Sequence, residues 1–364
     1  MEKIYLDAPN LGPVEKEYLV KCLNSNYVST VGPFVPDFEE EFARLLGAGA
    51  AVAVQSGTAA LHMALHALGI GPGDEVIVPA LTFIATVNPV LYVGARPVIV
   101  DVDPATWNID PVGLEQAVTE NTRAVIPVHL YGNPCQMDAI MEIARRYNLY
   151  VIEDATESLG ALFNGHYTGT FGDFGCFSFN GNKLITTGGG GMLVTGDRER
   201  AQWVKFLVNQ ARDAAHGYYH PEMGFNYRMT NIEAALGLAQ LSRFRELLAR
   251  KKRYAVIYRE TLGDIPGLQF QSECQGGESA HWLSCLRVST VKAVKLAAAL
   301  AEEGIPTRRV FMPVSDMPYL REYARPCPHA RDIYEHGICL PSSTLNSDEV
   351  TKKAALTIRR VLLG

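Results

Sequence analysis

Short runs rich in valine and isoleucine recur through the first half of the chain, and segments with helical spacing separate them. Several of these runs are continuously apolar, which is the pattern of strands buried on both faces of a sheet. Strands that alternate with helices predict an α/β fold with a large, mostly parallel seven-stranded sheet. The seven expected strands cover residues 51–54, 75–79, 97–102, 124–130, 149–153, 176–179 and 192–195.

The rest of the chain predicts a second, smaller unit. Apolar residues at helical spacing predict helices over 58–68 and 137–147, and a long helical pattern over 230–258 leads out of the first unit. At 364 residues the chain exceeds what one compact core usually holds. We therefore expect a large domain over 1–245 and a small C-terminal αβ domain over 246–364. The small domain should contain strands over 283–288 and 337–340 and helices over 291–303 and 348–362.

Composition excludes several classes of protein. The net charge is −6 with acidic and basic residues interspersed, so no basic stripe exists for nucleic acid and no such partner is expected. The longest apolar stretches fall far short of the ~20 residues that cross a bilayer, so no membrane span is expected. Residues 2–20 have no apolar core of a secretory signal, which makes the cytoplasm the expected location. The seven cysteines are dispersed without a C-x-x-C pair, which favours reduced thiols.

The triplet Ser56-Gly57-Thr58 stands where the first strand turns into a helix. Free N–H groups at a helix start favour a phosphate, and Gly57 would let it approach closely. An ordinary Ser/Thr helix cap is the competing interpretation. Neither a P-loop nor a G-x-G-x-x-G dinucleotide fingerprint occurs, which argues against ATP and against a nicotinamide oxidoreductase.

Two further residues carry possible chemistry. Asp154 follows a predicted parallel strand at its carboxyl end, where α/β sheets bind ligands, and could keep a pyridine nitrogen protonated; a helix N-cap is the alternative. Lys183 follows the next strand and precedes four glycines, 188–191. A desolvated lysine can lose its proton and attack a carbonyl, although most lysines are solvated surface charges.

A phosphate turn, a pyridine-nitrogen acid and a reactive lysine occur in this order in fold-type I enzymes that use pyridoxal 5′-phosphate. The chain strongly resembles the DegT/DnrJ/EryC1/StrS family of nucleotide-sugar aminotransferases over almost its whole length. The segments that carry the resemblance are 79–86 (PALTFIAT), 153–158 (EDATES), 172–183 (GDFGCFSFNGNK) and 224–231 (GFNYRMTN).

The resemblance implies a role for each matching residue. Lys183 would form a Schiff base with pyridoxal 5′-phosphate and act as acid and base, and Asp154 would pair with the ring nitrogen. Phe83 would stack on the ring, although composition alone favours core packing for it. Glu157 stands where many relatives have Gln near the cofactor's 3′ oxygen, so it would need protonation or a nearby cation. The remaining implied cofactor contacts are Gly57, Thr58 and Ser178 for the phosphate and Asn226 for the phosphate in the partner subunit of a homodimer.

The family also implies the substrates, which are L-glutamate and a nucleotide-linked keto sugar. The phrases at 130–133, 179–183, 210–212 and 337–342 are most similar to C4 aminotransferases of bacillosamine and legionaminic acid synthesis, which act on UDP-2-acetamido-2,6-dideoxy-hexos-4-ulose. Those at 107–110 and 128–132 are shared with GDP-perosamine synthases, so the nucleotide stays open. Loops that include 308–319 are expected to build the substrate pocket.

Rival readings remain for the whole chain and for single residues. A sugar dehydratase of this fold has histidine at the lysine position, which Lys183 argues against, and a non-catalytic regulatory protein would not need the intact pair of Asp154 and Lys183. The helical spacing of His62 and His66 suggests a metal pair, but a third ligand is missing and no metal is expected. Substrate contact and a structural role are equally open for His129 and His220.

Overall fold

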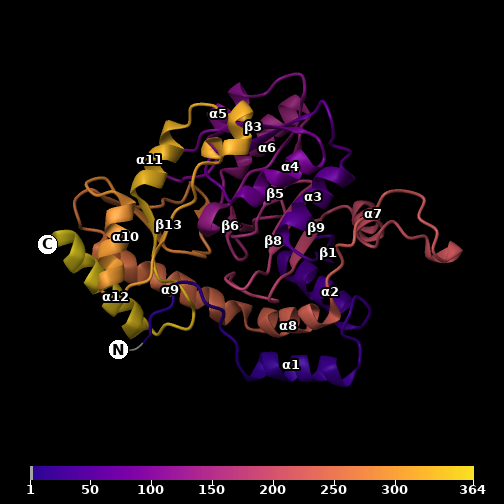
Figure 1. The fold of residues 1–364 in the computed structure, drawn as a ribbon, viewed down its shortest axis with the longest axis horizontal. Helices are drawn as coiled ribbons and strands as arrows, with labels where there is room; N and C mark the ends of the chain where they lie inside the picture. The colour runs from indigo at the N-terminus through magenta and orange to yellow at the C-terminus, as the bar shows by residue number, and fades with distance from the viewer. Residues whose placement is uncertain (1–2) are drawn as a thin grey trace.

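The seven apolar runs form one sheet in the computed structural model, which describes residues 3–364 (Figure 1). The strand order is β1-β9-β8-β5-β4-β2-β3; the five strands from β8 to β3 are parallel, and β9 runs antiparallel to both β8 and β1. The prediction of a large, mostly parallel seven-stranded sheet is confirmed. The bounds are β1 (Ala50–Val54), β2 (Glu75–Pro79), β3 (Arg96–Val100), β4 (Thr122–Val125), β5 (Tyr150–Asp154), β8 (Phe174–Ser178) and β9 (Gly191–Thr195).

Both faces of this sheet are buried, as the continuous apolar runs predicted. Val52 and Val54 of β1 enter the core beneath α3 (Gly57–Ala67), whereas Ala51 and Ala53 enter a second core with α2 (Phe34–Leu46). Successive side chains of a strand point to opposite faces, so an apolar residue at every position implies a cover on each side. Further helices around the sheet are α4 (Asn88–Tyr92), α5 (Pro111–Gln116), α6 (Met137–Tyr147) and α7 (Arg198–Val208).

The C-terminal part has its own antiparallel sheet, with strand order β10-β12-β14-β13, and its own apolar cluster around Tyr258, Leu286 and Ile338. This arrangement contains the predicted strands and helices of the small unit, while the boundary at 245 stays a prediction. The bounds are β10 (Leu268–Phe270), β12 (Cys285–Val288), β13 (Arg308–Arg309), β14 (Gly337–Cys339), α10 (Ala293–Glu302), α11 (Pro328–His336) and α12 (Asp348–Leu363).

The long helical pattern over 230–258 is two helices, α8 (Asn231–Ser242) and α9 (Phe244–Leu262), that meet at Arg243. The helical spacing continues through the break, so the sequence pattern did not reveal it. At the break, the guanidinium of Arg243 donates to the carboxylate of Glu15 at 2.9 Å and to the carbonyl of Asn10 at 3.2 Å. Contacts distant in sequence therefore accompany the break.

The N-terminal segment reaches across to the C-terminal part. The N–H of Tyr5 donates to Asn346 at 2.9 Å, the carbonyl of Leu6 accepts from the N–H of Ser342 at 2.6 Å, and Ile4 packs against the small cluster. The chain then runs into α1 (Pro13–Asn24), which packs against α8 along the lower edge of the view in Figure 1. Neither α1 nor α2 was predicted.

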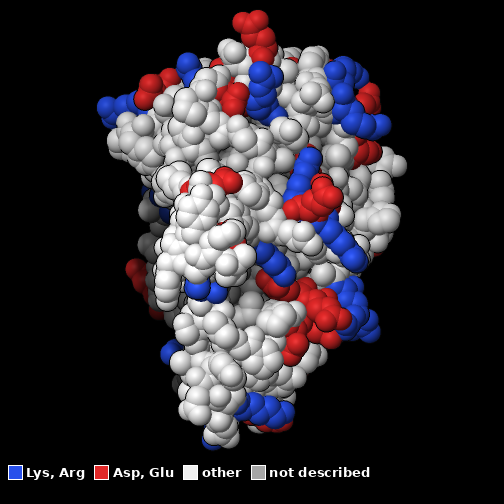
Figure 2. Space-filling view, turned by 90° about the vertical axis from the view of Figure 1, so that its right-hand side faces the viewer, with Lys and Arg blue, Asp and Glu red and all other residues white. Residues whose placement is uncertain are grey.

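The remaining strands are short. A small three-stranded sheet has the order β11-β6-β7 and consists of β6 (Leu162–Phe163), β7 (His166–Tyr167) and β11 (Gly277–Glu278). No helix within residues 3–364 is both long enough and apolar enough to cross a membrane. Acidic and basic side chains are interspersed on the face shown in Figure 2, in agreement with their mixing along the chain.

Candidate active site

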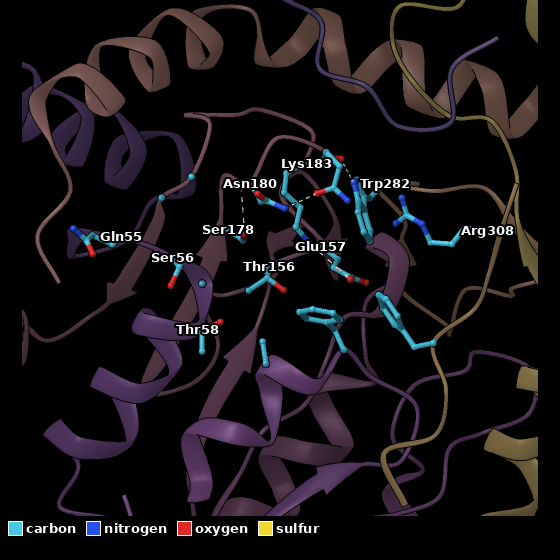
Figure 3. A pocket seen from close by; sticks show the side chains of 17 residues that line it. Gln55, Ser56, Thr58, Thr156, Glu157, Ser178, Asn180, Lys183, Trp282 and Arg308 are labelled. Atoms are coloured by element: carbon cyan, nitrogen blue, oxygen red, sulfur yellow. Dashed lines mark hydrogen bonds and ion pairs between the residues drawn. The ribbon is translucent and has the colours of Figure 1, made fainter. Parts of the chain in front are cut away.

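A cavity of about 250 Å³ lies where the first turn of α3 meets the segments that follow β5 and β8 (Figure 3). The C-terminal part closes one side of it. Six predicted site residues line this one cavity, and a seventh, Asp154, is the last residue of β5. The six are Gly57, Thr58, Phe83, Glu157, Ser178 and Lys183.

One end of the cavity is suited to an anion. Ser56 caps α3 by accepting from the N–H of Ala59 at 3.0 Å, so the helix-cap interpretation is also correct. The N–H groups in the first turn of α3 have no acceptor within the helix, and they point out of its N-terminal end. A side chain at position 57 would not fit, because a Cβ there would lie 2.8 Å from Cγ2 of Thr156 and 3.0 Å from Cβ of Ser178. Only glycine leaves this helix start open to a phosphate.

Asp154 is a buried carboxylate held by hydroxyl and amide donors. It accepts from Oγ1 of Thr86 at 2.7 Å, from Oγ1 of Thr156 at 2.7 Å and from the N–H of Thr156 at 3.2 Å. The element that follows β5 is the strand β6 and no helix begins at Asp154, so the N-cap alternative for Asp154 is wrong. Three donors therefore fix the orientation of this carboxylate at the end of β5.

Lys183 is not a solvated surface lysine, since its side chain is only 13% exposed. Its Nζ lies 3.8 Å from Oε1 of Glu157, and Figure 3 shows the two side chains pointing toward each other. Burial lowers the pKa of Lys183, and the charge of Glu157 acts in the opposite direction. Burial raises the pKa of Glu157 to about 7, against the opposing charge of Lys183 and a hydrogen bond from the N–H of Tyr131. The raised pKa of Glu157 and the amine of Lys183 beside it are the two features that a glutamate in this position requires.

Phe83 and Asn226 lie in different surroundings. Phe83 is 55% exposed on the cavity wall, with its ring 5.6 Å from that of Phe311, so core packing is wrong for it. Asn226 is exposed, forms an isolated bridge with Asn209 and does not line the cavity of its own chain. Its expected reach to a partner subunit stays a prediction.

Sequence reasoning missed several residues around the lysine. Trp282, Arg308 and Phe311 line the cavity from the C-terminal part, and Asp7 of the N-terminal segment pairs with Arg308 and accepts from Asn182 at 3.1 Å. Only the expectation of a pocket loop over 308–319 pointed to this side. No local motif marks Trp282 or Asp7, because tertiary contacts alone bring them to the site.

The histidines lie elsewhere. His129 is fully buried, 3.0 Å from a carboxylate oxygen of Glu153, and accepts from the N–H of Cys135, so its role is structural. His220 contacts the carbonyl of Gln210 on the surface. His62 lies 3.2 Å from the hydroxyl of Tyr227. Across residues 3–364, no group of three or more His, Cys, Asp or Glu could hold a metal ion.

Comparison with known proteins decides the family. The profile of the DegT/DnrJ/EryC1/StrS aminotransferase family matches residues 9–358. The chain belongs to this family. It is therefore an enzyme, a nucleotide-sugar aminotransferase whose cofactor is pyridoxal 5′-phosphate, as the resemblance implied.

Two relatives within the DegT/DnrJ/EryC1/StrS family illustrate its range. The chain is 46% identical to the GDP-perosamine synthase of Caulobacter vibrioides over 87% of both chains. It is 42% identical to the putative pyridoxal phosphate-dependent aminotransferase EpsN of Bacillus subtilis, over 96% of this chain and 93% of that one. The bacillosamine and legionaminic acid subgroup is not confirmed by these relatives.

A solved family structure has the same fold. The putative sugar aminotransferase Spr1654 of Streptococcus pneumoniae, in its PMP form, superposes with a TM-score of 0.94 at 28% identity, covering 99% of this chain and 98% of that one. This similarity confirms the fold-type I architecture that the sequence predicted.

Proposed function

We propose that this enzyme transfers the amino group of L-glutamate to C4 of a nucleotide-linked 4-keto-6-deoxy sugar, with Lys183 and Asp154 as its catalytic residues. The observation that carries the proposal is the buried amine of Lys183, 3.8 Å from Glu157, in a cavity that begins at an open helix start. A family member that had lost its activity would not need to keep this amine out of water.

The residues around the cavity fit pyridoxal 5′-phosphate. The space that Gly57 leaves beside Ser178 suits the phosphate, together with the first turn of α3 and the hydroxyl of Thr58. Phe83 offers an aromatic face on the cavity wall, and the carboxylate of Asp154 suits a protonated ring nitrogen. When bound, the cofactor supplies an aldehyde that combines with amines and a ring that accepts electron density.

The chain's own residues Lys183 and Glu157 are suited to transfer protons. Burial brings the pKa of Lys183 below its usual range, so its amine can be a nucleophile and a base nearer neutral pH. Glu157 is held beside it and can carry a proton at neutral pH, since its pKa is about 7. In that form Glu157 can donate a hydrogen bond to the 3′ oxygen of the cofactor, the role for which relatives use Gln.

The sugar nucleotide has two candidates. The phrases at 130–133 and 337–342 favour UDP-2-acetamido-2,6-dideoxy-hexos-4-ulose. The 46% identity with a GDP-perosamine synthase favours a GDP-linked 4-keto-6-deoxymannose as the second candidate. Arg308 and Phe311, which belong to the expected substrate loop, are positioned to contact either one.

We also propose a homodimer in which Asn226 completes the site of the partner subunit. The segment that follows α7 projects from the body of the subunit (Figure 1) and carries exposed apolar side chains, including Tyr218 (87% exposed) and Met223 (70%). Such side chains favour a protein contact over solvent. Sedimentation analysis tests the dimer, and a cofactor affinity that Asn226→Ala leaves unchanged would contradict the shared site.

The experiment that tests the substrate uses purified enzyme, L-glutamate and each keto sugar separately. UDP-2-acetamido-2,6-dideoxy-hexos-4-ulose and GDP-4-keto-6-deoxymannose are the two acceptors, and NMR of the product identifies the carbon that has gained nitrogen. Amination at C4 of the UDP sugar supports the first candidate, and amination of the GDP sugar alone supports the second. If the enzyme turns over neither acceptor, both substrate candidates are refuted.

A further inference from the structure

Trp282 touches the reactive lysine in two ways. Its ring lies under the amine of Lys183, with Nζ 4.1 Å from the ring centroid. Its indole N–H donates to the carbonyl of Asn182, the residue that precedes the lysine, at 2.7 Å (Figure 3). One side chain from the C-terminal part is therefore tied both to the head of the lysine and to the backbone that carries it.

Lys251 holds the backbone of Trp282 in place. The amine of Lys251 donates to the carbonyl of Trp282 at 2.8 Å and to that of Ser342 at 2.6 Å, and the lysine is 3% exposed. Burial lowers the pKa of Lys251 to about 7. A neutral amine has two N–H groups, which matches the two carbonyls. The indole also stacks on Tyr131, with ring centroids 6.1 Å apart and an interplanar angle of 23°.

The electrostatic surroundings of Lys183 are mixed. Burial has the largest effect and lowers the pKa of Lys183, as Arg308 does, whereas Glu157, Asp154 and Asp7 favour the charged form. Asp7 is also engaged with Arg308, which weakens its effect on the lysine. The face of an indole attracts an ammonium group and adds to the stability of the charged form.

We propose that Trp282 is a positioning residue that holds the amine of Lys183 against its ring whenever that amine is not bonded to the cofactor and stabilises the protonated form of the amine, and that Lys251 supports it. This inference rests on the proposed role of Lys183. Its consequence is that the lysine does not swing freely after it is released. The amine stays beside Glu157 and above the tryptophan, where it can take up and return a proton.

The test measures the protonation of Lys183 in full-length protein loaded with pyridoxamine 5′-phosphate, an amine that cannot bond covalently to a lysine amine. Trace acetylation with acetic anhydride from about pH 6 to about pH 10, followed by mass spectrometry of the peptide that contains Lys183, gives the pH midpoint of the amine. Trp282→Leu removes the aromatic face and should lower this midpoint by roughly half to one and a half pH units. Trp282→Phe keeps a weaker face and should lower it less.

A matched control is Trp203→Leu, because Trp203 lies on α7 and does not line the cavity. Its midpoint should equal that of the wild type. Lys251→Met should shift the midpoint downward as well, since the tryptophan loses its support. If Trp282→Leu fails to fold by circular dichroism, Trp282→Phe decides the question.

The proposal is overturned if the deciding Trp282 variant folds, binds pyridoxamine 5′-phosphate and shows an unchanged or raised pH midpoint for Lys183. A raised midpoint would mean that Trp282 only keeps water away from the lysine. An unchanged midpoint in Lys251→Met overturns the supporting role of Lys251. Failure of the proposed function is a separate result, because wild-type enzyme would then transfer no amino group to either keto sugar while the midpoints could still be measured.

Discussion

Nζ of Lys183 lies 3.8 Å from Oε1 of Glu157, and both side chains are removed from water. Burial favours the neutral form of each group, whereas their mutual attraction favours the charged pair. Burial is the larger effect for both groups, so it raises the pKa of Glu157 and lowers that of Lys183, and the two values lie closer together than in water. A smaller difference between the two pKa values eases proton exchange between the groups, which is the property that an acid–base catalyst needs.

Replacement of Glu157 by glutamine should change how stability depends on pH. The pKa of Glu157 rises from 4.5 to about 7 on folding, so the native protein binds more protons than the unfolded chain between these values. Wild-type stability should therefore fall as pH rises through this window, and Glu157→Gln should lack that fall. Relative to wild type, the variant should gain roughly 2–3 kcal/mol between pH ~5 and pH ~7 in urea unfolding. Parallel pH profiles for the two proteins would refute this.

Lys183→Ala should abolish the covalent link to the cofactor and leave the fold intact. After borohydride treatment, mass spectrometry should find the reduced cofactor on Lys183 in the wild type and on no residue in the variant. Loss of general acid–base catalysis should cost on the order of a hundredfold or more in transamination. Circular dichroism is the control for folding. A labelled lysine elsewhere in the variant would show that another amine takes this role.

Asp154→Asn tests the charge of the buried acid while keeping its shape. The hydroxyls of Thr86 and Thr156 donate to different carboxylate oxygens, Oδ2 and Oδ1, so in the variant one can still donate to the amide oxygen while the other accepts from the amide nitrogen, and the fold should persist. Loss of a fixed charge next to the cofactor ring should slow the glutamate half-reaction by on the order of a hundredfold, followed as a single-turnover change in cofactor absorbance. Thr86→Val, which removes one donor and no charge, is the matched control and should be slowed less. Equal rates for Asp154→Asn and wild type would exclude Asp154 as a catalytic residue.

Lys251→Met should destabilise the protein by an amount that depends on pH. Two buried carbonyls lose their donor, which costs about 2 kcal/mol or more. The pKa of Lys251 falls from 10.5 to about 7 on folding, so the native state binds fewer protons and wild-type stability rises with pH in that range. The stability difference between wild type and variant should therefore widen by roughly 2 kcal/mol from pH ~7 to pH ~9 in urea unfolding. A difference that is constant with pH would contradict a neutral amine in the native state.

The sheet and the family residues were predictable from the sequence for physical reasons. A strand buried on both faces needs apolar residues at successive positions, and several of the seven strands have such a run. Ser178 ends β8, Lys183 follows it, and Asp154 ends the neighbouring strand β5, so once the sheet is parallel there these residues lie at one edge. Local pattern and site geometry are linked directly in this part of the chain.

The other side of the site could not be predicted in the same way. Trp282 and Arg308 belong to the C-terminal part, and Asp7 belongs to a segment that crosses to it. Their positions depend on how two units pack, which no short motif encodes. Phe83 illustrates the limit of composition, because an aromatic residue near a strand end is more often in a core, yet here it is 55% exposed.

The walls of the cavity come from distant parts of the polypeptide, from Gln55 to Phe311, and one lining residue, Asn182, bonds to Asp7 near the N-terminus. During synthesis on the ribosome, Asp154 and Lys183 emerge well before Trp282 and Arg308. Until the C-terminal part has been synthesised, the cavity around Lys183 therefore lacks the wall that Trp282, Arg308 and Phe311 form. Tight capture of the vitamin B6 coenzyme is consequently a late event, and a truncated product that lacks the last wall should be released without it.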